Sequence, residues 1–156
     1  MKPKIIAMVG PSGAGKTFAA EYLKKELGVS VIVSFTTRPM RIGETNGIEH
    51  FFVEETEMPP KNQMLAYTKF GDHHYWAEVR QVLKNDRCIY VVDEKGLLYL
   101  MDNFSHNFEI IPVLIKRDIK RLSPEISIDR IKRDDSRINI EDNYYQYVIV
   151  NNGTLE

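Results

Sequence analysis

The stretch Gly-Pro-Ser-Gly-Ala-Gly-Lys-Thr, residues 10–17, lies near the start of the chain and matches G-x-x-x-x-G-K-[ST] at all four fixed positions. An apolar run at residues 5–9 precedes it and predicts a buried strand. A helical pattern follows over residues 18–27. A strand, a glycine-rich loop and a helix in this order predict a loop that wraps phosphate groups.

The residue types in this stretch suit phosphate binding. Glycines let backbone N–H groups turn inward around a phosphate with no Cβ in the way, and the start of the helix adds partial positive charge. The Lys16 ammonium can reach the β- and γ-phosphates of a nucleotide, and the Thr17 hydroxyl can bind Mg²⁺. We therefore expect ATP and Mg²⁺ as cofactors, with Lys16 catalytic. The predicted cofactor-binding residues are Gly10, Pro11, Ser12, Gly13, Ala14, Gly15, Lys16 and Thr17.

Length and composition predict one globular domain. The chain has 156 residues, 43% hydrophobic and 28% charged, which is enough apolar material for one core. Its formal net charge of -1 gives no support for a nucleic-acid or membrane-surface partner. The single cysteine, Cys88, begins an apolar run and is interpreted as a core residue. Because there is no secretory signal and no apolar stretch of about 18 residues, we expect a cytoplasmic protein.

Strand and helix signals alternate along most of the chain. Gly28 is placed to stop the first helix. Apolar runs predict further strands over residues 29–34, 49–53, 87–93, 108–115 and 144–150. Helical patterns cover residues 77–85, 94–103 and 121–137, and residues 64–70 and 73–76 form a predicted hairpin about Gly71-Asp72.

This alternation predicts an α/β fold of the P-loop NTPase type, in which a parallel sheet of about five strands is flanked by helices. Residues 34–76 break the rhythm and are interpreted as an inserted small α+β subdomain. The core would then comprise residues 1–33 and 77–156. We expect the insert to lie near the carboxyl ends of the strands, where open α/β sheets bind ligands.

A second stretch of sequence resembles a known family. Residues 34–44 read Ser-Phe-Thr-Thr-Arg-Pro-Met-Arg-Ile-Gly-Glu, and Asn46-Gly47 and Phe51-Phe52-Val53 follow. This resembles the guanylate kinase family, which has S-x-T-T-R-x-x-R-x-G-E, a D/N-G turn and Y-x-F-V. Shorter matches at residues 93–96, similar to D-x-x-G, and 147–152, similar to Y-x-V-x-N-D/N, extend the resemblance over nearly the whole chain.

The resemblance implies Mg²⁺-dependent transfer of the ATP γ-phosphoryl group to the 5′-phosphate of GMP or dGMP. The insert then becomes an acceptor-binding subdomain. Two guanidinium groups three residues apart in one loop can converge on a single phosphate. The residues matched to acceptor-binding positions are Ser34, Arg38, Arg41, His50, Tyr75 and Asp93, and Arg38 is also assigned a catalytic role.

Two further positions are matched to the donor side. Asn151 is expected to bind the nucleotide. Asp93 ends a predicted strand beside the phosphate loop, where it would share the metal shell with Thr17, partly through water; an ordinary cap at the strand end is the simpler alternative. The expected partners are the small-molecule nucleotides alone, with no nucleic acid and no membrane, and the protein is expected to be a monomer or a homodimer.

Residues 117–137 are similar to the family's lid, whose arginines close over the transferring group. Arg130 and Arg133 are the predicted catalytic residues there, and Arg137 is a further candidate. The lid's usual R-G-T segment is absent. Spacing alone also allows Arg130, Asp134 and Arg137 to form a solvated, salt-bridged helix face.

The groups that read the base in this family are largely replaced. Ala66 stands at the position of the pocket's glutamate, Ala77 at that of a Ser/Thr, and Val91 at that of the first Asp of a D-x-D strand end. A pocket without its carboxylate cannot accept hydrogen bonds from guanine N1–H and N2–H in the usual way. Asp72, His73 or Glu78 could substitute.

Two alternatives to a guanylate-kinase-like enzyme remain open at this stage. One is an ATP-dependent kinase of another nucleotide or of a sugar phosphate, which the lost base contacts favour. The other is a catalytically silent binding module similar to the guanylate-kinase-like domains of scaffold proteins. The intact Gly15-Lys16-Thr17 argues against the silent module.

Overall fold

A computed structural model describes residues 2–11, 13–117 and 140–152. The larger of its two sheets has five strands in the order β2-β7-β1-β8-β9, and every neighbouring pair is parallel. The prediction of a parallel sheet of about five strands is therefore confirmed. Its strands are β1 (Lys4–Val9), β2 (Ser30–Val31), β7 (Arg87–Val91), β8 (Glu109–Lys116) and β9 (Tyr147–Val150).

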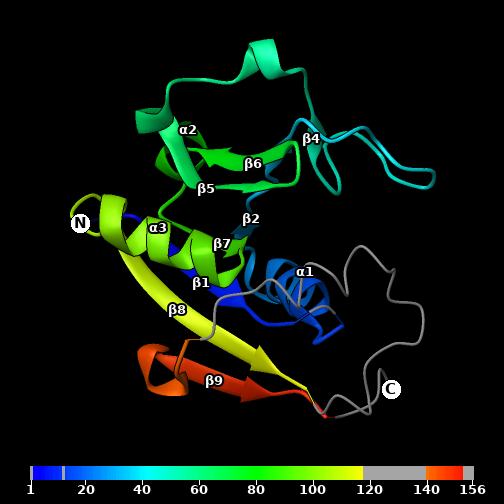
Figure 1. Cartoon of the computed structure of the whole chain (residues 1–156). Coiled ribbons are helices and arrows are strands. Elements are labelled where there is room, and N and C mark those ends of the chain that lie inside the picture. Colours follow the sequence, from blue (N-terminus) through cyan, green and yellow to red (C-terminus); the bar gives the residue numbers. More distant parts are fainter. Residues whose placement is uncertain (1, 12, 118–139, 153–156) are drawn as a thin grey trace.

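The central strand β1 is buried on both faces, which is why its sequence is a continuous apolar run. Successive side chains of a strand point to opposite faces. Ile5 therefore packs in one core cluster with Leu97 of α3 (Glu94–Phe104), whereas Met8 packs in a second cluster with Ala20 of α1 (Lys16–Leu27). Among the described residues, α3 therefore lies on one face of the sheet and α1 on the other (Figure 1).

The ends of both long helices follow from their sequence. Gly28 stops α1 in the left-handed conformation, with φ of 66°, and its N–H donates to the carbonyl of Lys24. At the start of α3, the Asp93 carboxylate accepts a hydrogen bond from the Gly96 N–H at 2.7 Å. Asp93 therefore acts as the N-cap of α3.

The second sheet has four strands in the order β4-β3-β6-β5 and is mixed. Strands β3 and β4 are parallel, whereas β6 is antiparallel to both β3 and β5. Its elements are β3 (Phe35–Thr36), β4 (Phe51–Phe52), β5 (Met64–Phe70) and β6 (His73–Glu78), together with the 3-10 helices η1 (Glu55–Glu57) and η2 (Lys61–Gln63). We call residues 34–78 the small lobe.

The small lobe is joined to the main core by side-chain packing as well as by the chain. Leu65 of β5 and Ala77 of β6 are fully buried in the same cluster as Leu97 and Leu100 of α3. The short helix α2 (Val79–Leu83) leads back into β7. Figure 1 shows the small sheet on one side of α3 and the long strand β8 on the other.

Several sequence predictions are wrong in their boundaries. Residues 35–36 were not among the expected strands but form β3, because they pair with β4 on one side and β6 on the other. The strand expected at 29–34 is reduced to β2, since Ser34 already leaves toward the small sheet. Asp142–Tyr144 form a 3-10 helix, so β9 begins only at Tyr147.

Two further expectations concern burial. Cys88 is fully buried in the core, and burial raises the pKa of its thiol to about 11. This agrees with a core role and disfavours a nucleophilic one. Across the part of the chain that the structure describes, no helix is both long and apolar enough to cross a bilayer.

Candidate functional site: a phosphate loop and an arginine loop

The glycine-rich stretch forms the turn between β1 and α1. Gly13 and Gly15 have φ values of 80° and 98°, in the left-handed region that favours glycine. A Cβ on Gly10 would collide with the Ile115 carbonyl oxygen, and one on Gly15 would collide with the Asn151 side chain. The loop geometry therefore requires glycine at both fixed positions of the motif.

Lys16 and Thr17 occupy the first turn of α1. The Lys16 ammonium folds back over the loop and donates to the carbonyl oxygen of Gly10. Thr17 is exposed. The first N–H groups of a helix lack intrahelical partners and carry partial positive charge. The loop thus combines backbone donors, a cation and a hydroxyl, the groups that hold a nucleotide triphosphate.

Asn151 lies against this loop from the far end of the sequence. Its backbone N–H donates to Lys116 at 2.7 Å, which continues the ladder between β8 and β9. Its side-chain amide donates to the Ala14 carbonyl oxygen at 3.0 Å. Asn151 therefore braces the phosphate loop, which is where the sequence resemblance predicts a nucleotide-binding residue.

Asp93 leaves the sheet at the same edge as the phosphate loop. Strands β1 and β7 are adjacent and parallel, with Met8 opposite Val91, so Gly10 and Asp93 both follow the carboxyl ends of their strands. Among the described residues, no three His, Cys, Asp or Glu side chains gather as a metal cluster. That is compatible with Mg²⁺, which is usually bound by one or two carboxylates together with substrate phosphates.

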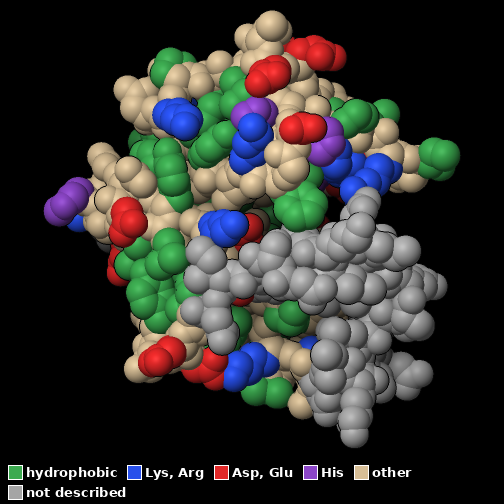
Figure 2. Space-filling model, in the orientation of Figure 1, with side chains coloured by type: hydrophobic (Ala, Val, Ile, Leu, Met, Phe, Trp, Pro, Cys, Tyr) green, Lys and Arg blue, Asp and Glu red, His purple; other side chains and the backbone are tan. Residues whose placement is uncertain are grey.

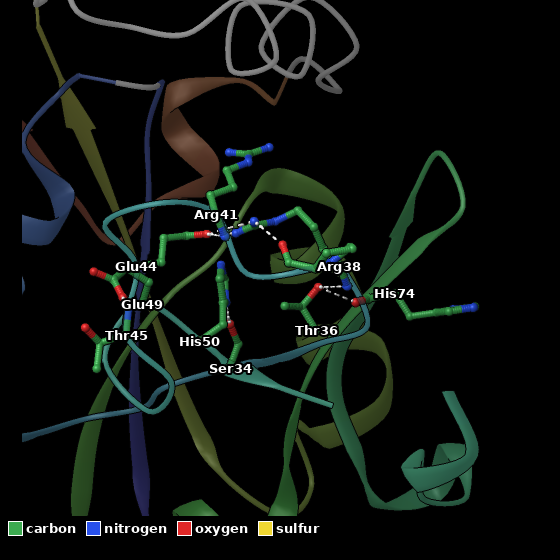
Figure 3. A network of polar contacts seen from close by, with 10 residues as sticks. Ser34, Thr36, Arg38, Arg41, Glu44, Thr45, Glu49, His50 and His74 are labelled. Carbon is green, nitrogen blue, oxygen red and sulfur yellow. Dashed lines mark hydrogen bonds and ion pairs between the residues drawn. The ribbon is translucent and has the colours of Figure 1, made fainter. Parts of the chain in front are cut away.

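The arginine loop, residues 38–44 between β3 and β4, holds the second group of predicted site residues. Arg38 is 7% exposed, and its guanidinium donates to both carboxylate oxygens of Glu44, at 2.8 and 2.9 Å, and to the Pro39 carbonyl at 2.9 Å. The Arg41 backbone N–H also donates to Glu44, at 2.8 Å, while its side chain is exposed. Glu44 therefore organises both arginines of the loop (Figure 3).

The pairing with Arg38 shifts the pKa of Glu44 strongly. The hydrogen bonds from Arg38, together with the backbone bond from Arg41, lower the pKa of Glu44 to about 2. In return, Glu44 is the main cause that raises the pKa of Arg38, with a further contribution from Tyr75. The Arg38 guanidinium also lies over the Phe52 ring, 5.4 Å from its centroid. The guanidinium is thus held in one place before any ligand arrives.

Ser34, His50 and Tyr75 lie beside the arginine loop. The Ser34 hydroxyl is 2.8 Å from His50 Nδ1, and the His50 and Tyr75 rings meet edge to face with centroids 5.7 Å apart. In Figure 3 the His50 side chain points from Ser34 toward Arg38 and Arg41. The structure therefore brings together five of the predicted acceptor residues, whereas the sixth, Asp93, lies just after the carboxyl end of β7 in the main sheet.

Sequence reasoning did not single out Thr36 or Glu44 as functional residues. Thr36 is fully buried; its hydroxyl donates to the His74 carbonyl at 2.9 Å and accepts from the Arg38 N–H at 3.1 Å. Thr36 thus fixes the backbone of Arg38, as Glu44 fixes its side chain. Each occupies a fixed position of S-x-T-T-R-x-x-R-x-G-E, and this was the signal that could have found them.

The two alanines at the base-reading positions are enclosed. Ala66 is 4% exposed and has φ of 49°, at a break in the register between β5 and β6, and Ala77 is fully buried. The Ala66 methyl faces the first turn of α3. If Gly96 in that turn had a Cβ, this atom would lie 3.3 Å from the Ala66 Cβ. At these two positions the lobe therefore holds methyl groups where the family pattern described above has a carboxylate and a hydroxyl.

Some predicted residues lie outside the described residues: Ser12 of the phosphate loop, and Arg130, Arg133 and Arg137 of the expected lid.

The surface of the small lobe in Figure 2 carries basic, acidic and histidine side chains close together. A glycine-rich loop of this kind on a parallel sheet, combined with a second group of basic side chains on the small lobe, is typical of a P-loop phosphotransferase.

Comparisons with known proteins identify the family. The family model for guanylate kinase matches residues 2–155. The guanylate kinase of Caldanaerobacter subterraneus is 32% identical, with 94% of this chain and 79% of the relative covered. That of Malacoplasma penetrans is 28% identical, with 96% and 86% covered. The chain belongs to the guanylate kinase family.

A solved structure supports the fold independently. The crystal structure of guanylate kinase from Anaplasma phagocytophilum superposes with a TM-score of 0.66 at 21% sequence identity, and the match covers 97% of this chain and 79% of that one. At this identity the likeness concerns the fold alone. It matches the five-stranded parallel sheet flanked by helices that the sequence predicts.

Proposed function

We propose that this chain transfers the γ-phosphoryl group of ATP to the 5′-phosphate of GMP or dGMP, with Mg²⁺. The observation that carries the proposal is the presence on one chain of two differently built groups of side chains and backbone donors that suit phosphate. The loop at Gly10–Thr17 offers backbone amides and Lys16, whereas the arginine loop offers the guanidinium groups of Arg38 and Arg41. A phosphotransferase with a phosphorylated acceptor needs one site for each substrate.

On the donor side, the loop amides and the start of α1 would hold the triphosphate, and Asn151 would keep the loop in shape. Lys16 would exchange its bond to the Gly10 carbonyl for one to the phosphate oxygens, where negative charge develops during transfer. Thr17 and Asp93 would hold Mg²⁺, partly through water. When bound, the ion neutralises charge on the phosphates.

On the acceptor side, Arg38 spends three N–H bonds on Glu44 and Pro39. A guanidinium has five N–H donors. Tyr75 also interacts with the guanidinium through its side chain, and the donors not used in these bonds would meet the acceptor phosphate on a group that is already oriented. Arg41, Tyr75 and His50 would supply the other contacts. Holding both reacting groups in place lowers the entropic part of the barrier and helps exclude water.

The proposed division of the chain assigns acceptor binding to residues 34–76, with residues 1–33 and 77–156 as the core and 117–137 as a lid carrying Arg130 and Arg133. Leu65, near the start of β5, and Ala77, near the end of β6, are buried in the main core. This supports a lobe that is anchored to the core at the end of the hairpin away from its turn. We expect the protein to act on free nucleotides, as a monomer or a homodimer.

A wider acceptor range is the second candidate function, and the enclosed methyl groups of Ala66 and Ala77 favour it. Arginines select any phosphate, whereas base choice needs polar groups that a wrong base leaves unpaired. A coupled assay of ADP release over a panel of nucleoside monophosphates, with a sugar phosphate included, tests both functions. Turnover of GMP above the rest supports the first, comparable turnover of several acceptors the second, and no turnover overturns both.

A further inference from the structure

A cavity of about 660 Å³ lies at the edge of the main sheet opposite the phosphate loop. Its lining includes Pro3, which directly precedes β1, and Phe108, which directly precedes β8. The phosphate loop follows the other end of β1, so the six residues of this strand separate the two sites by about 20 Å. Pockets for small molecules have volumes of about 300–1,000 Å³. The cavity is therefore large enough to hold a small-molecule ligand.

The walls of the cavity come from both parts of the fold. Lys61 lies in η2 of the small lobe, whereas Tyr99 and Asn103 lie one turn apart on α3. The Tyr99 hydroxyl donates to the Lys61 carbonyl oxygen at 3.5 Å, so the lobe and the helix meet at the cavity. Leu83 of α2 lines another side. A ligand in the cavity would therefore contact the small lobe and the main core at once.

Aromatic rings form much of the apolar lining. Phe104, at the end of α3, and Phe108 are 8% and 2% exposed, and their rings stack with centroids 6.0 Å apart. The Tyr99 ring centroid lies 6.4 Å from that of Phe104. Leu83, by contrast, is 65% exposed, so the cavity also offers an apolar side chain that is open to solvent. Rigid ring walls of this kind favour a flat ring as the ligand.

Three asparagines and one lysine supply polar groups to the same cavity. The asparagines are Asn62, Asn103 and Asn107. The Asn103 amide is held by its hydrogen bond to the Tyr99 carbonyl oxygen, at 2.9 Å. Side-chain amides carry both donors and an acceptor, so they can pair with a ring nitrogen. Among the described residues that line the cavity, Lys61 is the only charged one, and this charge favours an anionic group on the ligand.

The Lys61 ammonium is positioned by an aromatic contact. It lies over the Tyr67 ring of β5, 4.9 Å from the ring centroid. A cation–π contact uses the face of the ring and consumes no hydrogen-bond acceptor. An ammonium has three N–H donors, so Lys61 can bind an anion while it remains against Tyr67.

We propose that this cavity is a second ligand site, which takes a flat nitrogen heterocycle that carries one anionic group. The rings of Tyr99 and Phe104 would contact the heterocycle, the asparagine amides would meet its ring nitrogen, and Lys61 would bind its anion. The site uses no group of the proposed phosphoryl transfer, so either proposal can fail without the other. A bound ligand would hold η2 of the small lobe against α3 and would stabilise the folded chain.

The binding test uses quinoline-3-carboxylate as the probe and follows the side-chain amide signals of the asparagines by NMR. A ligand of this size typically binds with a Kd of about 1 mM, so a titration to about 10 mM covers the expected range. We expect the Asn103 and Asn107 signals to shift and saturate, both without nucleotides and with saturating ADP and GMP. Quinoline-3-carboxamide, which lacks the charge, should bind about fivefold more weakly. Naphthalene-2-carboxylate, which lacks the ring nitrogen, should also bind more weakly.

Variants locate the anion contact. Lys61→Gln should weaken binding of the carboxylate about fivefold and leave that of the carboxamide unchanged. Lys69→Gln, at an exposed position of β5 outside the cavity, is the matched control and should bind the carboxylate like the parent. Thermal melts show whether each variant folds, and the probe should raise the Tm of the parent.

Three results would overturn the proposal. The first is the absence of saturable shifts up to about 10 mM probe in the folded parent. The second is equal affinity for all three compounds, or for the carboxylate in the parent and in Lys61→Gln. The third is displacement of the probe by ADP and GMP, which would place it in the nucleotide sites.

Discussion

The Glu44 carboxylate binds the Arg38 guanidinium through two parallel hydrogen bonds, at 2.8 and 2.9 Å. The guanidinium side chain is 8% exposed and the carboxylate side chain 17%. The carboxylate fixes the orientation of the guanidinium, so in the proposed reaction the acceptor phosphate would meet an arginine that is already oriented. The pair also links the chemistry of the loop to the stability of the fold.

The first prediction concerns stability in acid. The pKa of Glu44 falls from 4.5 to about 2 because of Arg38, so its stabilisation is fully present above the unfolded value and is lost as pH falls toward 2. Glu44→Gln should lower the free energy of unfolding by about 1–3 kcal/mol at pH 6. Because the variant lacks the titrating carboxylate, its free energy of unfolding should fall less than that of the parent when the pH is lowered. Urea unfolding at several pH values measures this. Glu26→Gln, on the exposed face of α1, should behave like the parent, and equal acid dependence in all three proteins would contradict the prediction.

The second prediction is that Lys16→Ala nearly abolishes phosphoryl transfer while leaving the fold intact. The Lys16 ammonium donates to the Gly10 carbonyl of the phosphate loop, and in the proposed reaction it lies where charge would develop between the β- and γ-phosphates. Loss of one such electrostatic group costs about 10²–10³ in rate. Steady-state kcat and a thermal melt measure both parts. Activity within a few fold of the parent would remove Lys16 from the mechanism.

The third prediction separates the two arginines. Arg41→Ala should raise the acceptor KM by about tenfold or more, with little change in the ATP KM or in thermal stability, because its side chain is exposed. Arg38→Ala should raise the acceptor KM too, but it should also destabilise the fold, because it removes both guanidinium bonds to the Glu44 carboxylate. A rise in the ATP KM alone would mean that donor and acceptor sites are assigned in reverse.

The fourth prediction concerns the base. With methyl groups at Ala66 and Ala77, discrimination between GMP and AMP should fall well below the ~10⁴–10⁵ that a fully paired polar site can reach. Ala66→Glu should increase selectivity for GMP, measured as the ratio of kcat/KM values. It should also lower stability by about 1–3 kcal/mol, because Ala66 is buried against the first turn of α3. Strict GMP selectivity in the parent would show that another side chain reads the base, with Asp72, His73 and Glu78 the first to test.

The sequence predicts the main sheet well because both of its faces are buried. Ile5, Ala7 and Val9 pack under α3 while Met8 packs under α1, and this leaves an uninterrupted apolar run that is easy to recognise. The phosphate loop is equally clear, since its glycines are required by backbone geometry and by the close approach of Asn151. The alternation of elements indicates a parallel sheet, although the strand order itself comes only from the structure.

The small lobe was harder to predict, because its strands are short and are defined by their neighbours. Phe35 and Thr36 form a strand only through pairing with Phe51–Phe52 and with β6. The Phe35 ring stacks on the Trp76 ring with centroids 5.7 Å apart, which is a contact between residues far apart in the chain. The pairing of Arg38 with Glu44 could not be predicted for another reason. The motif contains both residues, but it does not show which arginine binds the glutamate.

The most direct test of the account follows phosphorus through the reaction. The protein is incubated with ATP, GMP and Mg²⁺, and ³¹P NMR records every product, with Lys16→Ala as the control. We expect ADP and GDP in equal amounts, both dependent on GMP, and almost none from Lys16→Ala. ADP with inorganic phosphate but no GDP, or no product from any nucleoside monophosphate, would contradict the claim that the arginine loop presents an acceptor phosphate to ATP.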